Sequence, residues 1–174
     1  MKTSILLAST CLYAVAVFSQ KQFFDFQDYV GKKFPLPNLR TIDGKEIGLS
    51  QLLGKPTLIN FWFTSCAPCI EEMPALNNIK NELGDKVNFV AITFESAAKA
   101  KKFLTKHAFD FTHIVNAKAF TDSLQMKALP VNVFLDKMGI VYDIQMGVPL
   151  APAENKEMKI GDGKEFLELL KKLL

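Results

Sequence analysis

The stretch Thr57–Pro74, which reads TLINFWFTSCAPCIEEMP, decides the fold. Its first seven residues are rich in β-branched and aromatic side chains, the composition of a buried strand. A Cys-x-x-Cys sequence follows and opens a helix, which we expect to stop at Gly84 and to kink at Pro74. The sequence therefore predicts two cysteines at a junction between a strand and a helix.

The two cysteines are expected to differ in role. If Cys66 lies at the N-cap of the helix, unpaired backbone N–H groups and the helix dipole favour its thiolate, which makes it the nucleophile. Cys69 falls on the same face of the first turn, close enough to form a disulfide and more enclosed by the helix. We expect Cys69 to be the resolving thiol.

Length and charge limit the classes of function. The chain has 174 residues, 49% of them hydrophobic, which is enough for one domain with a sizeable core. Its net charge is only +3, Arg40 is its single arginine, and no basic run exceeds two residues. Because phosphate recognition usually needs a dense patch that includes arginine, we expect no nucleic-acid partner.

The N-terminus, Met1–Ser19, has the pattern of a secretory signal peptide, with a lysine, an apolar run and small residues before Gln20. Lipid attachment at Cys11 and an uncleaved membrane anchor are the alternatives, and either would tether the protein through its N-terminus. All three place the domain outside the cytosol, in the periplasm or on the outer face of the cytoplasmic membrane.

Removal of Met1–Ser19 leaves Cys66 and Cys69 as the only cysteines. A bridge that closes so small a loop constrains the unfolded chain little, so the pair is expected to serve chemistry. The alternative is a static structural pair.

The other segments alternate between strand and helix patterns. Residues 20–33 form an aromatic-rich leader, irregular or briefly helical, and residues 34–174 form the domain, which starts with a hairpin around Asp43-Gly44. Further strands are expected at 87–93, 111–115, 131–135 and 140–145, and helices at 96–108, 119–127 and 163–174. This order predicts an α/β sandwich with a mixed sheet.

This order of elements, with NFWFTSCAPC, Pro74 and the later Leu129-Pro130-Val131, resembles the thioredoxin superfamily. More specifically, it resembles exported TlpA/ResA-type thiol-disulfide oxidoreductases. The resemblance implies a thioredoxin-like sandwich, a mixed central sheet flanked by helices, with an N-terminal β-hairpin and a central strand-helix insertion. It also implies that Pro130 is cis and faces the disulfide, where the backbone of Leu129 can pair with an extended substrate.

Two positions bear on proton transfer. Thioredoxins commonly carry a buried aspartate where this chain has Asn60, which cannot accept a proton. A glutamate three residues after the second cysteine lies near the pair in ResA-type proteins, and Glu72 occupies that position. We expect Glu72, with a pKa raised by burial, to take the proton of Cys69. The alternative is that Glu72 is a solvent-facing carboxylate near the helix N-terminus.

Other residues are candidates for substrate binding. Pro68 lies between the cysteines, Trp62 is expected to pack under the active site, and Glu95 follows a strand at the edge where such sheets bind ligands, although it could equally belong to a helix N-cap. Ser65 stands where the superfamily often has tryptophan. Because Ala67 and Pro68 carry no charge, the motif favours a reductase or isomerase over a strong oxidant.

These features predict an exported thiol-disulfide oxidoreductase that needs no cofactor beyond its Cys66–Cys69 disulfide, binds no metal and acts as a monomer. The resemblance implies protein disulfide substrates, such as apocytochrome c, and a membrane thiol donor of the DsbD or CcdA type. A thiol peroxidase is the enzymatic alternative, but Phe63 occupies the threonine position of that class and no arginine follows Arg40. A non-enzymatic binding module is the third class. A zinc site with His107 and His113 has the wrong spacing, and haem attachment would need histidine at Ile70.

Overall fold

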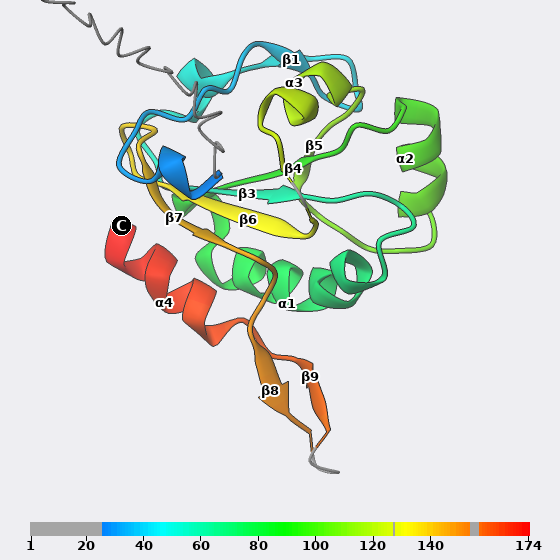
Figure 1. Cartoon of the computed structure of the whole chain (residues 1–174), viewed down its shortest axis with the longest axis vertical. Helices are drawn as coiled ribbons and strands as arrows, with labels where there is room; N and C mark the ends of the chain where they lie inside the picture. The colour runs from blue at the N-terminus through cyan, green and yellow to red at the C-terminus, as the bar shows by residue number, and fades with distance from the viewer. Residues whose placement is uncertain (1–25, 127, 154–156) are drawn as a thin grey trace, which may run out of the picture.

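A computed structural model describes residues 26–126, 128–153 and 157–174. Its centre is a five-stranded mixed sheet in the order β5-β4-β3-β6-β7 (Figure 1). The central strand β3 (Thr57–Phe61) has parallel β4 (Asn88–Ile92) and then β5 (Thr112–Ile114) on one side. Antiparallel β6 (Val131–Leu135), followed by β7 (Val141–Gln145), lies on the other side. The expected mixed sheet is confirmed.

Helices cover both faces of this sheet. In Figure 1, α1 (Ala67–Leu83) and α4 (Lys164–Leu173) lie below it, and α3 (Lys118–Ser123) lies above it. The α2 helix (Ala97–Leu104) lies beside the sheet, and the expected N-terminal hairpin, β1 (Leu39–Arg40) and β2 (Glu46–Ile47), lies on the α3 side. Short 3-10 helices span Phe26–Tyr29, Leu49–Leu52 and Gly84–Lys86.

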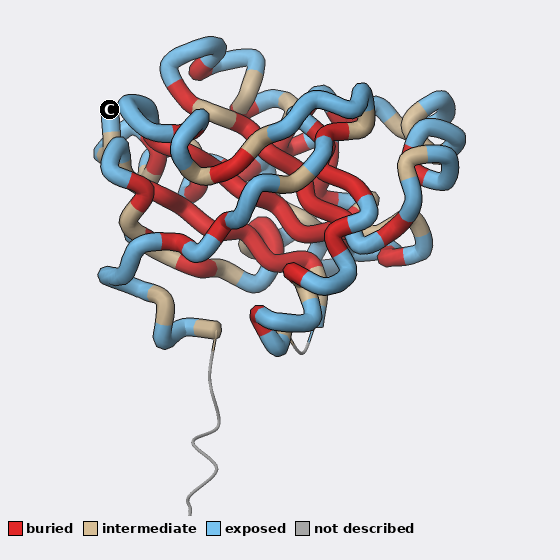
Figure 2. The backbone as a smooth tube through the Cα atoms, turned by 90° about the horizontal axis from the view of Figure 1, so that it is seen from above, coloured by how far each residue is buried: buried red, intermediate tan, exposed pale blue. Residues whose placement is uncertain are grey.

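The two faces explain why β3 and β6 are buried at every position (Figure 2). Side chains alternate along a strand, so Leu58 points into the core shared with α1, whereas Ile59 and Phe61 point into the core shared with α3. By the same alternation, Asn60 faces α1.

The helix after the cysteines has the expected limits. Cys66 is the N-cap of α1, Pro74 lies within the helix, and Gly84 ends it with a positive φ of 54°. Glycine adopts that conformation without the steric penalty of a Cβ.

Two helices are shorter than expected. Instead of running to Ala108, α2 ends at Leu104, because the Asn77 side chain binds the Ala108 carbonyl and the Asp110 N–H and holds this segment against α1. Instead of reaching Lys127, α3 ends at Ser123, and Gln125 soon after it has a positive φ of 51°. The hydrophobic pattern of the sequence does not predict where either helix ends, because both ends depend on the local backbone conformation.

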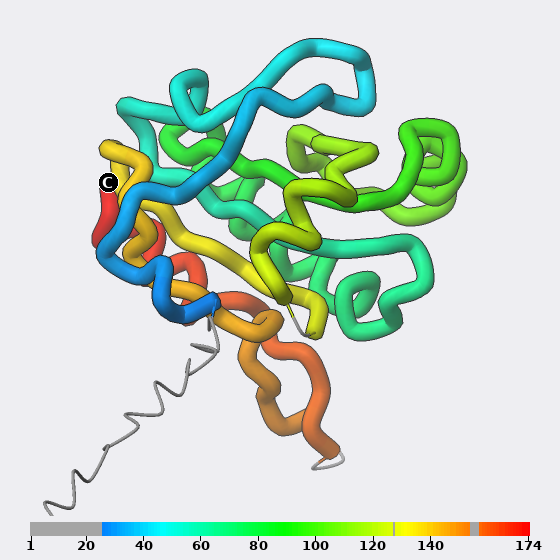
Figure 3. Tube along the Cα trace, turned by 45° about the horizontal axis from the view of Figure 1, so that its top comes forward, coloured from blue at the N-terminus to red at the C-terminus, as the bar shows by residue number. Residues whose placement is uncertain are grey.

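An additional hairpin was not expected from the sequence. It consists of β8 (Leu150–Pro152) and β9 (Met158–Ile160) and projects from the body of the molecule between β7 and α4 (Figures 1 and 3). Each strand has only three residues, too few to show the alternating pattern that indicates a strand, and β8 contains Pro152.

The signal-peptide prediction and residues 20–25 of the leader lie outside the described residues. From Phe26 onward the leader packs on the domain, since Phe26 and Tyr29 contact the core on the α3 side. The N–H of Gly31 donates to the Val141 carbonyl of β7. Among the described residues, no helix has the length and apolar composition needed to cross a membrane.

Candidate active site

Cys66 and Cys69 form a disulfide at the N-terminus of α1, with an S–S distance of 1.93 Å. Cys66 has an extended backbone conformation and caps the helix, with its Sγ accepting the N–H of Cys69 at 3.3 Å. Cys66 is 5% exposed and Cys69 is fully buried. Cys66 is thus the more exposed of the two cysteines, and its sulfur faces the N–H groups that stabilise a thiolate.

The Leu129–Pro130 peptide is cis, as the resemblance implies. Pro130 directly precedes Val131, which pairs with Phe61 at the end of β3 that leads to the cysteines. Leu129 is half-buried and packs against the hydrophobic cluster that contains both cysteines. The segment before β6 thus lies at the same edge of the sheet as the disulfide.

Gly147 brings a second loop to this edge. Its φ is 78°, and an added Cβ would lie 3.3 Å from Pro130 Cγ and 3.5 Å from Glu72 Oε2. The loop after β7 therefore contacts both the cis proline and the candidate proton acceptor.

Glu72 is fully buried one turn after Cys69, which disfavours the alternative of a solvent-facing carboxylate. Its Oε1 accepts from Asn60 Nδ2 at 2.7 Å, and its Oε2 accepts from the Val148 N–H at 2.8 Å. Asn132 Nδ2 lies 3.3 and 3.4 Å from the two oxygens. Burial raises the pKa of Glu72 from 4.5 to about 7, although the bonds from Val148, Asn60 and Asn132 act in the opposite direction. A carboxyl group with this pKa can both take and release a proton near neutral pH.

Sequence reasoning missed Asn132 and Val148 as members of this site. Asn132 lies opposite Asn60 in the β3–β6 register, and Val148 lies at the base of the unexpected β8–β9 hairpin. The one sequence signal was the polar residue at position 132 within an otherwise apolar strand, VNVFL.

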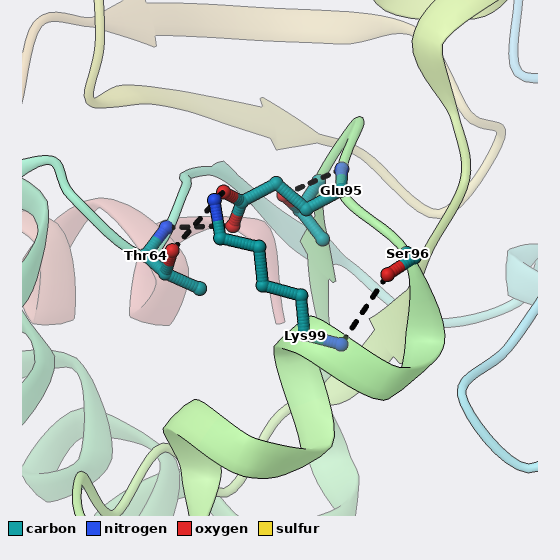
Figure 4. A network of polar contacts seen from close by, with 5 residues as sticks. Thr64, Glu95, Ser96 and Lys99 are labelled. Atoms are coloured by element: carbon teal, nitrogen blue, oxygen red, sulfur yellow. Dashed lines mark hydrogen bonds and ion pairs between the residues drawn. The ribbon is translucent and has the colours of Figure 1, made fainter.

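Glu95 is 7% exposed and holds the loop before the cysteines (Figure 4). Its carboxylate accepts from the N–H of Thr64 at 2.7 Å and from Thr64 Oγ1 at 3.0 Å, and it pairs with Lys99 Nζ at 2.5 Å. The adjacent Ser96 caps α2 by accepting the Lys99 N–H. These contacts make Glu95 a positioning residue for the segment that presents Cys66, and direct substrate binding by Glu95 stays a prediction.

The remaining candidates differ in exposure. Trp62 is fully buried and packs against the rings of Phe103, Phe109 and His113, so its part in substrate binding, still a prediction, would be indirect. Pro68 is exposed beside the disulfide, where a substrate can contact it.

Metal-binding groups do not gather in the described part of the chain, where no three His, Cys, Asp or Glu side chains lie close enough to hold an ion. His113 is buried in β5 with Nε2 2.7 Å from the Phe109 carbonyl, and burial lowers its pKa.

The fold and the site together define a thioredoxin-fold protein with a redox disulfide at a helix N-terminus. Comparison with known proteins gives the family. The Redoxin family profile matches residues 29–159. Thioredoxin-like protein YneN of Bacillus subtilis is 33% identical over 121 residues, which cover 67% of this chain and 71% of YneN. Thiol-disulfide oxidoreductase ResA of the same organism is 27% identical over 152 residues, 84% of each chain.

A solved structure agrees with these relatives. The crystal structure of a thiol:disulfide interchange protein DsbE from Chlorobium tepidum superposes with a TM-score of 0.65 and 25% identity, and the match covers 80% of this chain and 95% of that one. The chain belongs to the redoxin family, among the ResA/TlpA-type thiol-disulfide oxidoreductases of the thioredoxin superfamily, and it is an enzyme of that class.

Proposed function

We propose that this protein is an exported reductase of protein disulfides. The observation that supports this most directly is the arrangement of the two cysteines, with Cys66 at the N-cap of α1 and slightly exposed, and Cys69 fully buried in the first turn. The domain division of the sequence belongs to this proposal, with a signal peptide at 1–19, a leader at 20–33 and the redox domain at 34–174. The proposal also includes a location outside the cytosol and a monomeric state. A tether through Cys11 or through an uncleaved N-terminus is the alternative to cleavage of the signal peptide.

The reaction begins with the Cys66 thiolate. It attacks one sulfur of a substrate disulfide, forms a mixed disulfide and releases the other substrate sulfur as a thiolate. Cys69 then gives its proton to Glu72, and its thiolate attacks Cys66 Sγ. The Cys66–Cys69 bond forms, the mixed disulfide breaks, and the second substrate sulfur leaves as a thiolate. The substrate has gained two electrons, and the enzyme has lost them.

The substrate segment lies along Leu129. The edge before β6 adjoins the disulfide, and the backbone of Leu129 makes no hydrogen bond with the described residues. An extended substrate can pair with it in the manner of an added strand, with the exposed Pro68 contacting the substrate near its cysteine.

The surroundings of Cys66 support the reducing direction. Ala67 and Pro68 carry no charge, so the helix end is the main source of thiolate stabilisation, and a less stabilised reduced form makes a more reducing couple. The oxidised enzyme is then reduced again by a membrane thiol donor of the DsbD or CcdA type. Apocytochrome c and misoxidised exported proteins are the proposed substrates, and no cofactor beyond the disulfide takes part.

A trapping experiment tests the exchange reaction. Cys69→Ser leaves Cys66 able to attack but removes the resolving thiol, so mixed disulfides with exported proteins should accumulate and disappear on treatment with a reductant. Cys66→Ser is the matched control and should trap none. Failure of Cys69→Ser to trap any exported protein would refute the function. The direction is tested by the reduction potential, which should lie near or below about −270 mV, whereas a value near about −120 mV would indicate an oxidant.

A further inference from the structure

The buried carboxamides of Asn60 and Asn132 form a polar pair that the reaction described above leaves without a role. They lie directly opposite each other on β3 and β6, and both are essentially unexposed. Asn60 Nδ2 donates to Asn132 Oδ1 at 3.0 Å. Buried amides in an apolar sheet are unfavourable unless they are hydrogen-bonded, so the role of this pair needs an explanation.

All the described hydrogen-bond partners of Glu72 are donors. Asn60 Nδ2, Asn132 Nδ2 and the Val148 N–H all point at its carboxylate. This arrangement fits the ionised carboxylate, but a protonated carboxyl group has an O–H that needs an acceptor. The Val148 backbone at this position cannot supply one, because it presents only its N–H.

Asn60 carries the missing acceptor. Its Oδ1 is buried and has no hydrogen-bond partner in the described part of the chain. A half-turn of the Asn60 side-chain amide exchanges Oδ1 with Nδ2. The oxygen then takes the place of Nδ2, which now lies 2.7 Å from Glu72 Oε1. Asn132 must turn at the same time, since otherwise its Oδ1 would face the Asn60 oxygen. After both turns, Asn132 Nδ2 donates to Asn60 Oδ1, and Asn132 Oδ1 takes the place of its Nδ2 near the Glu72 oxygens. Asn60 Nδ2 moves to the place that Asn60 Oδ1 occupies now, and Glu72 Oε2 still accepts the Val148 N–H.

We propose that Asn60 and Asn132 are positioning residues whose side-chain amides turn together, presenting N–H groups to ionised Glu72 and a carbonyl oxygen to Glu72 once it carries the proton from Cys69. The exchange keeps the carboxyl group hydrogen-bonded before and after it takes the proton. No bond other than the S–H and O–H bonds of the proton transfer changes, and no further reactant is needed. This inference rests on the proposed role of Glu72 as the proton acceptor.

Among the described residues, no other titrating group faces Glu72 in the oxidised protein. Asn60 contacts it from β3, Asn132 from β6 and Val148 from the loop after β7. On α1, Cys69 is bridged and does not titrate, and the neighbouring Glu71 is exposed. Burial outweighs these hydrogen bonds and raises the pKa of Glu72 to about 7, so both protonation states are accessible near neutral pH.

Side-chain amide NMR on the oxidised protein, titrated through neutral pH, tests the proposal. Above the midpoint, the Asn60 amide protons should show cross-peaks to the Glu72 side chain; below it, these cross-peaks should be lost and the Asn132 amide protons should approach Asn60. The Asn88 amide, which donates to the Leu52 carbonyl and Thr57 Oγ1, is the internal control and should not change. The same cross-peaks on both sides of the midpoint would overturn the proposal.

Variants supply an independent readout. In Glu72→Gln, the Val148 N–H fixes the side-chain oxygen, so the new amide must donate toward Asn60, and the turned arrangement should be present at every pH. Asn60→Leu removes a hydrogen bond from both protonation states of Glu72, so the Glu72 titration should move little. A rise of roughly one to two pH units, the result expected if Asn60 only donates to the ionised form, would contradict the proposal. Asn132→Thr, whose hydroxyl can donate or accept, should also move the titration little.

The two proposals can fail separately. If Glu72→Gln slows the resolving step but the amides do not turn, the amide exchange is wrong and the proposed function stands. If the amides turn with the titration of Glu72 but Glu72→Gln leaves the resolving step unchanged, the catalytic role of Glu72 is wrong.

Discussion

Glu72 should make the oxidised protein less stable as the pH rises through the neutral range. Its pKa is raised from 4.5 to about 7 in the folded state, mainly by burial. Between these values the folded protein holds the proton and the unfolded chain has released it, so the free energy of unfolding falls with increasing pH. The stabilisation by Glu72 is fully present below its pKa in the unfolded chain and is lost as the pH rises through its pKa in the folded protein.

The magnitude follows from the shift. The change in pKa from 4.5 to about 7 corresponds to roughly 3 kcal/mol, and most of this should be lost between about pH 5 and pH 8. Glu72→Gln removes the titrating group and keeps the side-chain volume. The difference in unfolding free energy between the wild type and this variant should therefore change by that amount across the range.

The assay is denaturant unfolding of both proteins with the disulfide intact, at a series of pH values. Comparison with the variant is needed because His113 acts in the opposite direction. Burial lowers the pKa of His113, so its contribution to the free energy of unfolding increases as the pH rises toward its pKa in the unfolded chain. A difference between the wild type and Glu72→Gln that stays constant from about pH 5 to pH 8 would refute the account of Glu72.

Three further changes test other parts of the site. Glu95→Gln should destabilise the protein by roughly 1–3 kcal/mol and slow substrate exchange, because one carboxylate binds both Thr64 and Lys99. Lys99→Met should destabilise it less, and equal losses of stability in thermal unfolding would contradict this. Gly147→Ala should cost roughly 1–2 kcal/mol, since φ is 78° and the new methyl group would press on Pro130; a wild-type melting temperature would argue against that contact. Trp62→Ala should cost roughly 3–5 kcal/mol because the side chain is fully buried among aromatic rings, and a loss below about 1 kcal/mol in denaturant unfolding would show that the site repacks around it.

Much of the fold could be predicted because its signals are local. The β-branched run of β3, the cysteine that caps α1 and the glycine that ends it act within a few residues of where they stand in the chain. The limits of α2 could not be predicted in the same way, because Asn77, about thirty residues away, binds the backbone after that helix. The β8–β9 hairpin was missed because its short strands show no alternation.

The sequence by itself determined where the two cysteines stand, since strand composition and helix capping depend on neighbouring residues. It also placed Glu72 one turn after Cys69. Only the tertiary structure decided what surrounds that carboxyl group, because Asn132 and Val148 reach it through strand register and a loop contact across 60 and 76 residues of chain. Burial and long-range hydrogen bonds set its pKa, and both exist only once the sheet and α1 have packed together.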